Sequence, residues 1–156
     1  MNFSKESDHL QDKTKPEELL EAWIKLSAII KNTRVTKGLQ YNEATIMRLL
    51  YNRYREDKAG LISLKEITLK TRMLKSLVNR TVNSLEKKGL LERCESIGDR
   101  RVVYVRCVPE NLKEYLSVHN QSLTLAQKII NIIGDEDAEA FVRLTEKIEN
   151  AVIRPK

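Results

Sequence analysis

The sequence is short of the residue types from which catalytic and metal sites are built. It contains two cysteines, Cys94 and Cys107, and two histidines, His9 and His119, among 156 residues. No cluster of cysteine, histidine and carboxylate has zinc-like spacing. There is also no glycine-rich phosphate loop, no nucleophile motif and no evident acid/base pair. We therefore expect no enzyme, no metal site and no cofactor.

Long apolar runs are missing as well, although 41% hydrophobic residues are enough for a folded core. No run approaches the ~20 apolar residues that a membrane-spanning helix requires. Residues 1–18 lack the apolar middle of a signal peptide. Two cysteines are too few for the disulfide framework of a small secreted protein. These absences predict a cytoplasmic protein that does not enter a membrane.

The two cysteines lie on either side of a predicted turn. If the turn is centred near Gly98 and Asp99, Cys94 faces about residue 103, and Cys107 lies about four positions further along. At ~3.3 Å per residue this separation is too long for a direct bond. We expect two half-buried strand residues and no redox switch.

What the chain does have is a local excess of positive charge. Residues 60–107 hold eleven Lys and Arg and five Asp and Glu, a net charge of +6. The remaining residues hold seventeen of each sign, so the whole excess lies in the middle third. A surplus confined to one compact segment is typical of a face that binds a polyanion.

Apolar residues at helical spacing fill most of the chain. Asn42 and Ser63 are the expected N-caps of the second and third helices, and Glu66 adds a capping-box pattern after Ser63. The element order predicts a mostly α fold with one small antiparallel hairpin. The expected helices cover residues 16–35, 41–57, 63–72, 73–89, 110–134 and 135–154, and the expected strands cover 90–96 and 101–108.

The helix at 73–89 has two faces that differ sharply in chemistry. Its apolar arc, at about 100° per residue, consists of Leu74, Leu77, Val78, Val82 and Leu85, with Thr81 between them. The opposite arc has no acidic residue until Glu86, near its end. This polar arc consists of Lys75, Ser76, Asn79, Arg80, Asn83 and Lys87.

These polar residue types are the ones that contact DNA. Arginine gives two donors to guanine O6 and N7, asparagine bridges adenine N6 and N7, and serine or lysine holds phosphate. With the short helix before it, the helix at 73–89 forms a helix-turn-helix whose second helix would enter the major groove. An ordinary solvated surface helix is the competing interpretation.

The hairpin that follows favours the DNA interpretation. Its tip carries Asp99, Arg100 and Arg101 directly after Gly98. In a winged helix the ribbon follows the recognition helix, and narrow minor grooves attract arginine. Asp99 would pair with a neighbouring arginine and orient it. We therefore interpret the hairpin as a wing that faces DNA.

The segment 61–106 resembles the MarR family of bacterial winged-helix transcription regulators. The residues that carry the resemblance are Ser76, Asn79 with Arg80, the run LEKKGLLER at 85–93, and Asp99 with Arg101. The resemblance implies a homodimer that binds a pseudo-palindromic operator on double-stranded DNA near a promoter. Such regulators are commonly repressors that a ligand, metal or oxidant releases. The chain departs from the family after the wing, where RCVPENLKEY replaces the usual Leu-Thr-x-x-Gly turn.

The resemblance implies that Asp99 and Arg101 are the wing pair and that the face around Ser76 to Arg80 contacts bases. Together with the polar arc and the hairpin tip, it gives a set of expected DNA contacts and a domain plan. The expected major-groove residues are Lys75, Ser76, Asn79, Arg80 and Asn83, and the expected wing residues are Asp99, Arg100 and Arg101. The plan consists of a polar arm at 1–15, an N-terminal dimerisation helix at 16–40, a winged helix-turn-helix at 41–108 and C-terminal dimerisation helices at 109–156.

Apolar residues in the first and last helices independently favour dimerisation, because they exceed what a small winged-helix core needs. Intrachain packing is the competing interpretation of these side chains. They are Trp23, Ile24, Ile29, Ile30, Ile129, Ile130, Ile132, Ile133, Phe141, Leu144, Ile148 and Val152.

A small-molecule effector is a further expectation from the resemblance. The aromatic residues that could line its pocket are Trp23, Tyr51, Tyr54 and Tyr115, although aromatics at helical spacing are more often core. The alternative function is a winged-helix adaptor or antirepressor that binds a protein partner and no specific DNA. A salt-dependent affinity for DNA would separate the two.

Overall fold

A computed structural model describes residues 13–32, 38–95 and 98–153. The chain divides into two compact units, Met1–Arg34 and Val35–Lys156, and each is described by itself. Most of the predicted polar arm, residues 1–12, lies outside the described residues. The same holds for residues 33–37, within the predicted N-terminal dimerisation segment, and for residues 96–97 and 154–156.

The described part of the first unit, residues 13–32, consists mainly of the helix α1 (Lys15–Asn32). Pro16, Glu17 and Glu18 occupy its first turn, where a proline needs no amide hydrogen and acidic side chains favour the helix dipole. Its large apolar side chains have no cover within the unit, since Trp23 is 55% exposed. This helix therefore has an apolar surface that its own unit does not bury.

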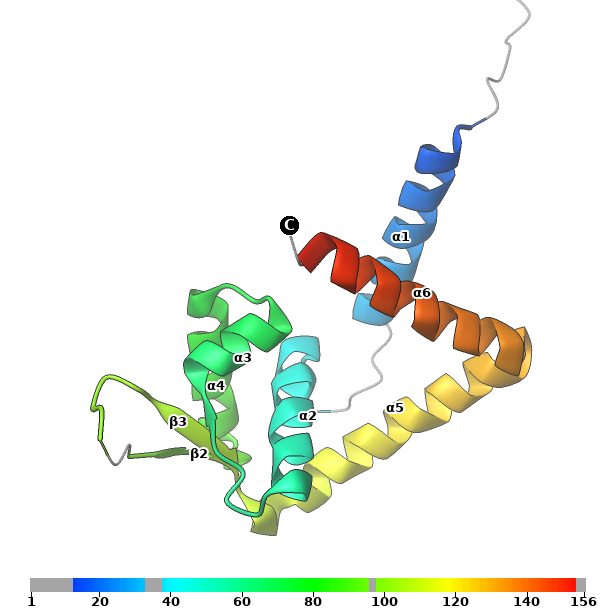
Figure 1. Ribbon diagram of the computed structural model, residues 1–156. Coiled ribbons are helices and arrows are strands. Elements are labelled where there is room, and N and C mark those ends of the chain that lie inside the picture. Colours follow the sequence, from blue (N-terminus) through cyan, green and yellow to red (C-terminus); the bar gives the residue numbers. More distant parts are fainter. Residues whose placement is uncertain (1–12, 33–37, 96–97, 154–156) are drawn as a thin grey trace, which may run out of the picture. The chain divides into compact units, whose positions relative to one another are not determined.

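The second unit is a helical body with a small sheet, as predicted (Figure 1). A 3-10 turn at Pro109–Asn111 links the sheet to the last two helices. Leu112, Tyr115 and Val118 hold the start of the long helix that follows this turn in the core. The elements are α2 (Tyr41–Glu56), β1 (Ile62–Ser63), α3 (Leu64–Thr71), α4 (Lys75–Lys87), β2 (Leu91–Cys94), β3 (Tyr104–Cys107), α5 (Leu112–Ile133) and α6 (Asp135–Ile153).

The sheet has three antiparallel strands in the order β1-β3-β2, whereas the sequence predicted a two-stranded ribbon. The additional strand is only Ile62–Ser63, which pairs with Val105 and Tyr104. Two residues are too few for a detectable alternation of apolar and polar positions. In the hairpin Leu91 faces Cys107, and Cys94 faces Tyr104 instead of the predicted residue 103.

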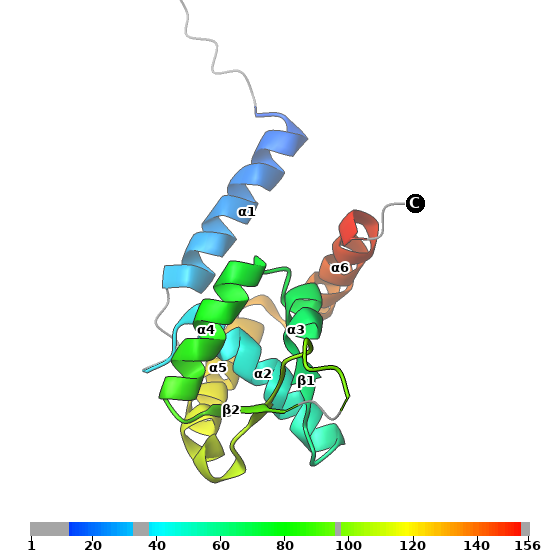
Figure 2. The same cartoon turned by 90° about the vertical axis from the view of Figure 1, so that its left-hand side faces the viewer.

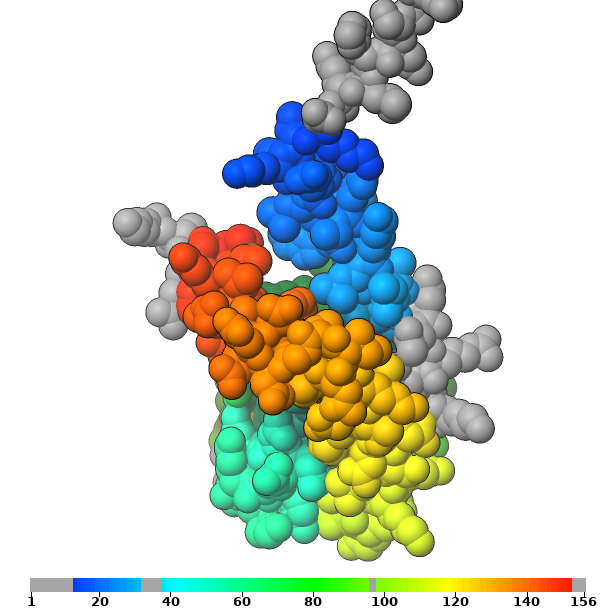
Figure 3. Space-filling model, turned by 90° about the vertical axis from the view of Figure 1, so that its right-hand side faces the viewer, coloured from blue at the N-terminus to red at the C-terminus, as the bar shows by residue number. Residues whose placement is uncertain are grey.

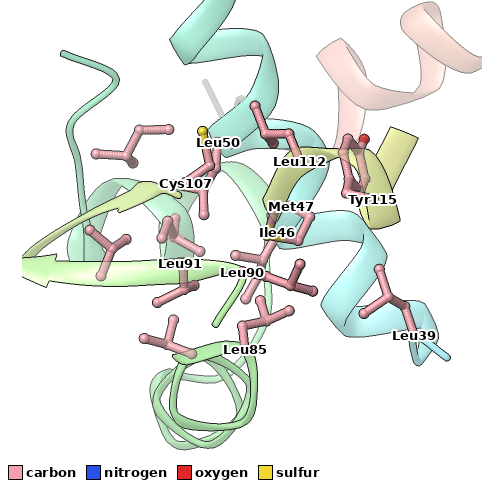
Figure 4. Packing of buried hydrophobic residues seen from close by; sticks show 14 of the residues in the cluster. Leu39, Ile46, Met47, Leu50, Leu85, Leu90, Leu91, Cys107, Leu112 and Tyr115 are labelled. Carbon is pink, nitrogen blue, oxygen red and sulfur yellow. The ribbon is translucent and has the colours of Figure 1, made fainter. Parts of the chain in front are cut away.

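The core of the second unit lies between α2, α4, the sheet and the first turns of α5 (Figure 4). Ile46, Met47 and Leu50 of α2 meet Leu85 of α4 and Leu91 of β2, all at most 1% exposed. Full burial of side chains of this size is worth about 1.5–3 kcal/mol each. The core therefore fixes α4 on its apolar side and leaves the other side free.

Two of the expected helix starts can be compared with the structure. Ser63 caps α3, and its hydroxyl accepts a hydrogen bond from the Glu66 amide at 3.1 Å. The prediction of Asn42 as the cap of α2 is wrong, because Gln40 holds that position. The Gln40 amide donates to the carboxylate of Glu43 at 2.9 Å. Glu43 therefore replaces the expected short cap by reaching back from the third position of the helix.

The helix α5 leaves the core after its second turn, and α6 follows it beyond Gly134 (Figure 3). From His119 onward no described residue of α5 or α6 is buried. Ile132 is 83% exposed and Phe141 52% exposed. These helices thus carry apolar side chains for which the second unit provides no cover.

None of the described helices is long and apolar enough to cross a membrane. The two cysteines are free, Cys94 half-buried and Cys107 fully buried rather than half-buried as expected. Burial raises the pKa of the Cys107 thiol, and a raised pKa disfavours the reactive thiolate. Cys107 therefore lies in the sheet as a small apolar side chain.

Candidate nucleic-acid interface

The polar face of α4 is the centre of the candidate interface. Val78, Thr81, Val82 and Leu85 are buried against the core. All predicted major-groove residues lie on the other side, where Lys75, Ser76, Arg80 and Asn83 are exposed and Asn79 is half-buried. No carboxylate interrupts this stretch. The burial of one arc thus presents the other arc as one continuous polar surface.

Two residues of the predicted apolar arc do not join the core, because Leu77 is only half-buried and Leu74 is exposed. Leu74 is 75% exposed, because it is the N-cap of α4 and its backbone is extended rather than helical. A leucine offers no acceptor to the first amides of the helix, and the first turn contains no acidic residue. The positive end of the helix dipole therefore lies unneutralised beside Lys75.

A tight turn sets the direction of α4. Arg72 is the C-cap of α3, and its φ of 60° places it in the left-handed region that non-glycine residues rarely occupy. Met73 and Leu74 then separate Arg72 from the start of α4 at Lys75. This short connection gives the helix-turn-helix that the sequence predicted.

The hairpin tip carries the predicted pair of charged wing residues. The backbone amide of Arg101 donates to Asp99 Oδ1 at 3.0 Å, and its Nε donates to the same oxygen at 3.3 Å. The side chain of Arg101 remains 92% exposed, and Arg100 is exposed beside it. The contact between Asp99 and an adjacent arginine was expected, whereas contact with DNA stays a prediction.

Figure 2 shows that α4 and the hairpin lie on the same side of the second unit. The two elements that carry the predicted contact residues therefore lie on one side of the unit. Charge is concentrated there, since the segment that contains both elements holds the whole net positive charge of the chain. Such a face attracts a polyanion over a distance of about a Debye length.

The buried carboxylate of Glu43, which the sequence did not reveal, holds α4 in place on the side away from this face. Glu43 is 2% exposed, and it accepts hydrogen bonds from Ser84 Oγ at 2.6 Å and from Lys88 Nζ at 2.7 Å. Lys88 Nζ also donates to the Gly38 carbonyl at 3.0 Å. Burial alone would raise the pKa of Glu43, but the hydrogen bonds from Lys88, Ser84 and the Gln40 amide outweigh it and lower the pKa.

A second contact ties α4 to the sheet. Arg93 of β2 donates through Nη2 to the side-chain oxygen of Asn83, and through Nε to Glu86 at 3.1 Å. Leu91 and Arg93 are two residues apart on one strand, so both side chains point toward α4. The only feature in the sequence that could have revealed Arg93 was its spacing from Leu91.

Of the four aromatic residues predicted to line a ligand pocket, two lie in one groove. Tyr51 and Tyr54 line an open groove of about 680 Å³ between α2 and the start of α5, with Arg55, Lys58 and Lys113 around it. Tyr115 packs into the core instead, with its ring 5.6 Å from that of Tyr51. Trp23 belongs to the other unit. Among the described residues no group of histidine, cysteine and carboxylate could hold a metal ion.

Comparison with known proteins gives a family and a fold. The model of the MarR family matches residues 38–102. No curated protein matches the chain in sequence. Several solved structures match it, and two of the three described below, PA4135 and BldR, are transcriptional regulators rather than enzymes.

Three of these structures cover most of the chain. The transcriptional regulator PA4135 is 18% identical, with 92% of this chain and all of that chain covered and a TM-score of 0.71. BldR from Sulfolobus solfataricus is 19% identical, with 90% and 100% covered and a TM-score of 0.70. BpsR from Bordetella bronchiseptica is 17% identical, with 87% and 99% covered and a TM-score of 0.68. The match over residues 38–102 confirms the resemblance to the MarR family, and the chain has the winged-helix fold of MarR-family transcriptional regulators.

Proposed function

We propose that this protein is a dimeric, sequence-specific DNA-binding regulator of transcription, of the MarR type. Helix α4 enters the major groove of a pseudo-palindromic operator, and the wing arginines reach the adjacent minor groove. The protein acts as a cytoplasmic repressor that a small ligand releases. The polar face of α4 carries this proposal, because five residues of types that contact DNA lie there without a carboxylate between them.

The geometry of α4 suits the major groove. The groove is about 12 Å wide and admits one α-helix. Lys75 and Ser76 occupy the first turn of α4, beside its positive end, where they can hold backbone phosphate. Asn79 and Arg80 follow one turn later, where side chains of a recognition helix contact base edges. Asp99, Arg100 and Arg101 supply the second, minor-groove contact.

The exposed apolar side chains of the terminal helices support the dimer. Ile132, Phe141 and Val152 are each at least 52% exposed in the single chain. Monomeric soluble proteins rarely leave such a series of large apolar side chains in water. We propose that a second copy of the chain covers them, through α1, α5 and α6. A two-fold dimer then places two α4 helices on successive turns of one face of the DNA.

A groove in the second unit could receive a small-molecule effector. In BpsR, 6-hydroxynicotinic acid regulates the binding of DNA. The groove lined by Tyr51 and Tyr54, with lysine and arginine at its edge, offers both aromatic and cationic contacts. We propose that a small effector acts on this protein too, without assigning its identity.

The test is a fluorescence-anisotropy titration on the intergenic DNA upstream of the protein's own gene, against a scrambled duplex at several salt concentrations. We expect tight binding that prefers the native sequence, with an affinity that falls steeply with salt. Arg80→Ala should relax the preference and cost about 1–3 kcal/mol, the value of one bidentate base contact. Absence of any DNA binding at low salt would refute the proposal and favour the protein-binding adaptor.

A further inference from the structure

The contact between Arg93 and Asn83 determines which half of the Asn83 side chain faces outward. Arg93 comes from β2, which lies against the end of α4 that leads into the sheet (Figure 2). Its Nη2 donates to Asn83 Oδ1, and its Nε holds Glu86 at 3.1 Å. The guanidinium thus binds two side chains, one turn apart, on the same helix.

The chemistry of the Arg93 guanidinium and the Asn83 carboxamide allows only one orientation of the amide. A guanidinium has five N–H donors and no acceptor, whereas a carboxamide has one acceptor oxygen and one donor NH₂ group. An amide flipped by 180° would place NH₂ against N–H and would lose the hydrogen bond. Asn83 therefore turns its oxygen toward Arg93 and its two N–H donors away from the sheet.

Glu86 makes this orientation stable. It is the only carboxylate on the polar face of α4, and its Oε2 holds Arg93 Nε. Because Arg93 is bound at two points, these contacts restrain the plane of its guanidinium beside Asn83. The ion pair also prevents Glu86 from presenting an uncompensated negative charge to DNA phosphates.

An asparagine that reads adenine needs both halves of its amide. The oxygen accepts from adenine N6 while the NH₂ group donates to N7. The Asn83 oxygen already accepts a hydrogen bond from Arg93 and keeps one lone pair, whereas both N–H donors of Asn83 stay unused. Asn83 is therefore better suited to contacts as a donor than to this bidentate mode. Asn79 differs, since within residues 38–95 and 98–153 no hydrogen bond to its side chain is present. The two asparagines of α4 are therefore not equivalent.

We infer that Arg93 is a specificity-determining positioning residue, which favours contacts of Asn83 with acceptor groups on DNA. These groups are guanine O6 and N7, thymine O4, adenine N7 and phosphate oxygen. Asn79 is the amide left for bidentate recognition of adenine. The inference deepens the proposed function and rests on it, because it assigns the polarity of one contact within the same interface.

The experiment measures base preference with a panel of operator duplexes, each changed at one base pair. The variants are Arg93→Met, Asn83→Asp and Asn83→Leu in the full-length protein. Arg106→Met is the matched control, because Arg106 is also a hairpin arginine in an ion pair, with Glu92 at 2.6 Å, but it makes no hydrogen bond to α4. Circular dichroism checks that each variant is folded.

Asn83→Asp and Asn83→Leu distinguish a donor from an acceptor. Aspartate keeps an oxygen for Arg93 but has no N–H group, and leucine has neither. If Asn83 meets DNA as a donor, both variants lose the same base preference, by about tenfold at the contacted position. If Asn83→Asp keeps the preference that Asn83→Leu loses, the oxygen makes the contact and the inference is wrong.

Arg93→Met tests the positioning role. We expect it to change preference at the same base pair as the Asn83 variants and to admit adenine there, since the freed amide can then turn. When Arg93→Met is already present, the added Asn83→Leu substitution should no longer cause the loss of base preference that it causes in the parent protein. Arg106→Met should weaken binding equally on all duplexes and leave the preference intact.

The possible results distinguish failure of the inference about Arg93 from failure of the proposed DNA-binding function. If the parent protein prefers its operator and Arg93→Met behaves like Arg106→Met, the inference is overturned while the proposed function stands. If the parent shows no preference for any duplex, both are overturned. A variant that does not fold is replaced by Arg93→Lys, which keeps the stem and the charge but lacks the fork that holds Asn83 and Glu86 together.

Discussion

Replacement of Glu43 should destabilise the second unit far more than replacement of an exposed carboxylate. Glu43→Ala leaves the Lys88 amine, the Ser84 hydroxyl and the Gln40 amide without their shared acceptor. Hydrogen bonds to a charged group contribute about 1.5–3 kcal/mol each, and removal of one partner from a buried ion pair costs about 3–5 kcal/mol. Lys88 is 38% exposed and keeps its bond to Gly38. Water therefore recovers part of the loss, and we expect a net cost of about 2–4 kcal/mol.

The measurement is urea unfolding followed by circular dichroism, at one fixed protein concentration because dimerisation contributes to stability. Glu92→Ala is the matched control. Glu92 pairs with Arg106 at 2.6 Å, but both side chains are 46% exposed, so the expected cost is about 0–1 kcal/mol. Equal costs for the two substitutions would refute the reasoning from burial. A double-mutant cycle with Lys88→Met should give a coupling energy above about 1 kcal/mol.

The same cluster predicts how stability depends on pH. The pKa of Glu43 is lowered from its ordinary value of 4.5 in the folded protein. Its contribution to the free energy of unfolding is therefore complete above pH 4.5 and disappears as the pH falls through the lower folded value. Glu43→Gln should show a smaller loss of stability than the parent between pH 5 and the acid limit. A parallel loss in both proteins would contradict this assignment.

Three further substitutions test other parts of the molecule. Arg101→Ala should weaken binding to all duplexes alike and reduce the slope of log affinity against log salt by about one, since the side chain is 92% exposed at the wing. Phe141→Glu should shift the protein toward monomer in sedimentation, because burial of an unpaired charge at the dimer interface costs several kcal/mol. The control, Lys147→Glu, should leave the dimer unchanged. Ellman's reagent should modify one thiol quickly, and Cys94→Ser should remove that reaction, since burial raises the pKa of Cys107.

The order of the elements could be predicted because each helix carries its own signature. In α4 the apolar residues recur at three- and four-residue spacing, so burial of Val78, Val82 and Leu85 followed from the sequence alone. The polar face followed with it, because whatever is not on the apolar arc of a helix must lie opposite. The wing pair could also be predicted, since Asp99 and Arg101 are only two residues apart.

Contacts between distant segments could not be predicted in the same way. Glu43 and Lys88 are 45 residues apart, and Arg93 and Asn83 lie on different elements. Nothing in a single sequence indicates which carboxylate meets which lysine when 28 basic and 22 acidic side chains are present. The strand β1 was missed for a related reason: its two residues form a strand only because β3 pairs with them.

The distribution of contacts along α4 gives a physical reason why one end of the helix is better suited to DNA than the other. The second half of α4 is held by side-chain hydrogen bonds. Asn83 and Glu86 accept from Arg93, and Ser84 donates to Glu43. In the first half, the polar side chains from Lys75 to Arg80 make no hydrogen bond or ion pair within the residues that the structure describes. A recognition helix contacts bases mainly through its N-terminal residues. The bonded half would hold the helix at a fixed angle, while the unbonded half keeps its donors for the groove. If this division is correct, substitutions in the first half reduce affinity for DNA without loss of stability, whereas Ser84→Ala lowers the urea midpoint and changes base preference little.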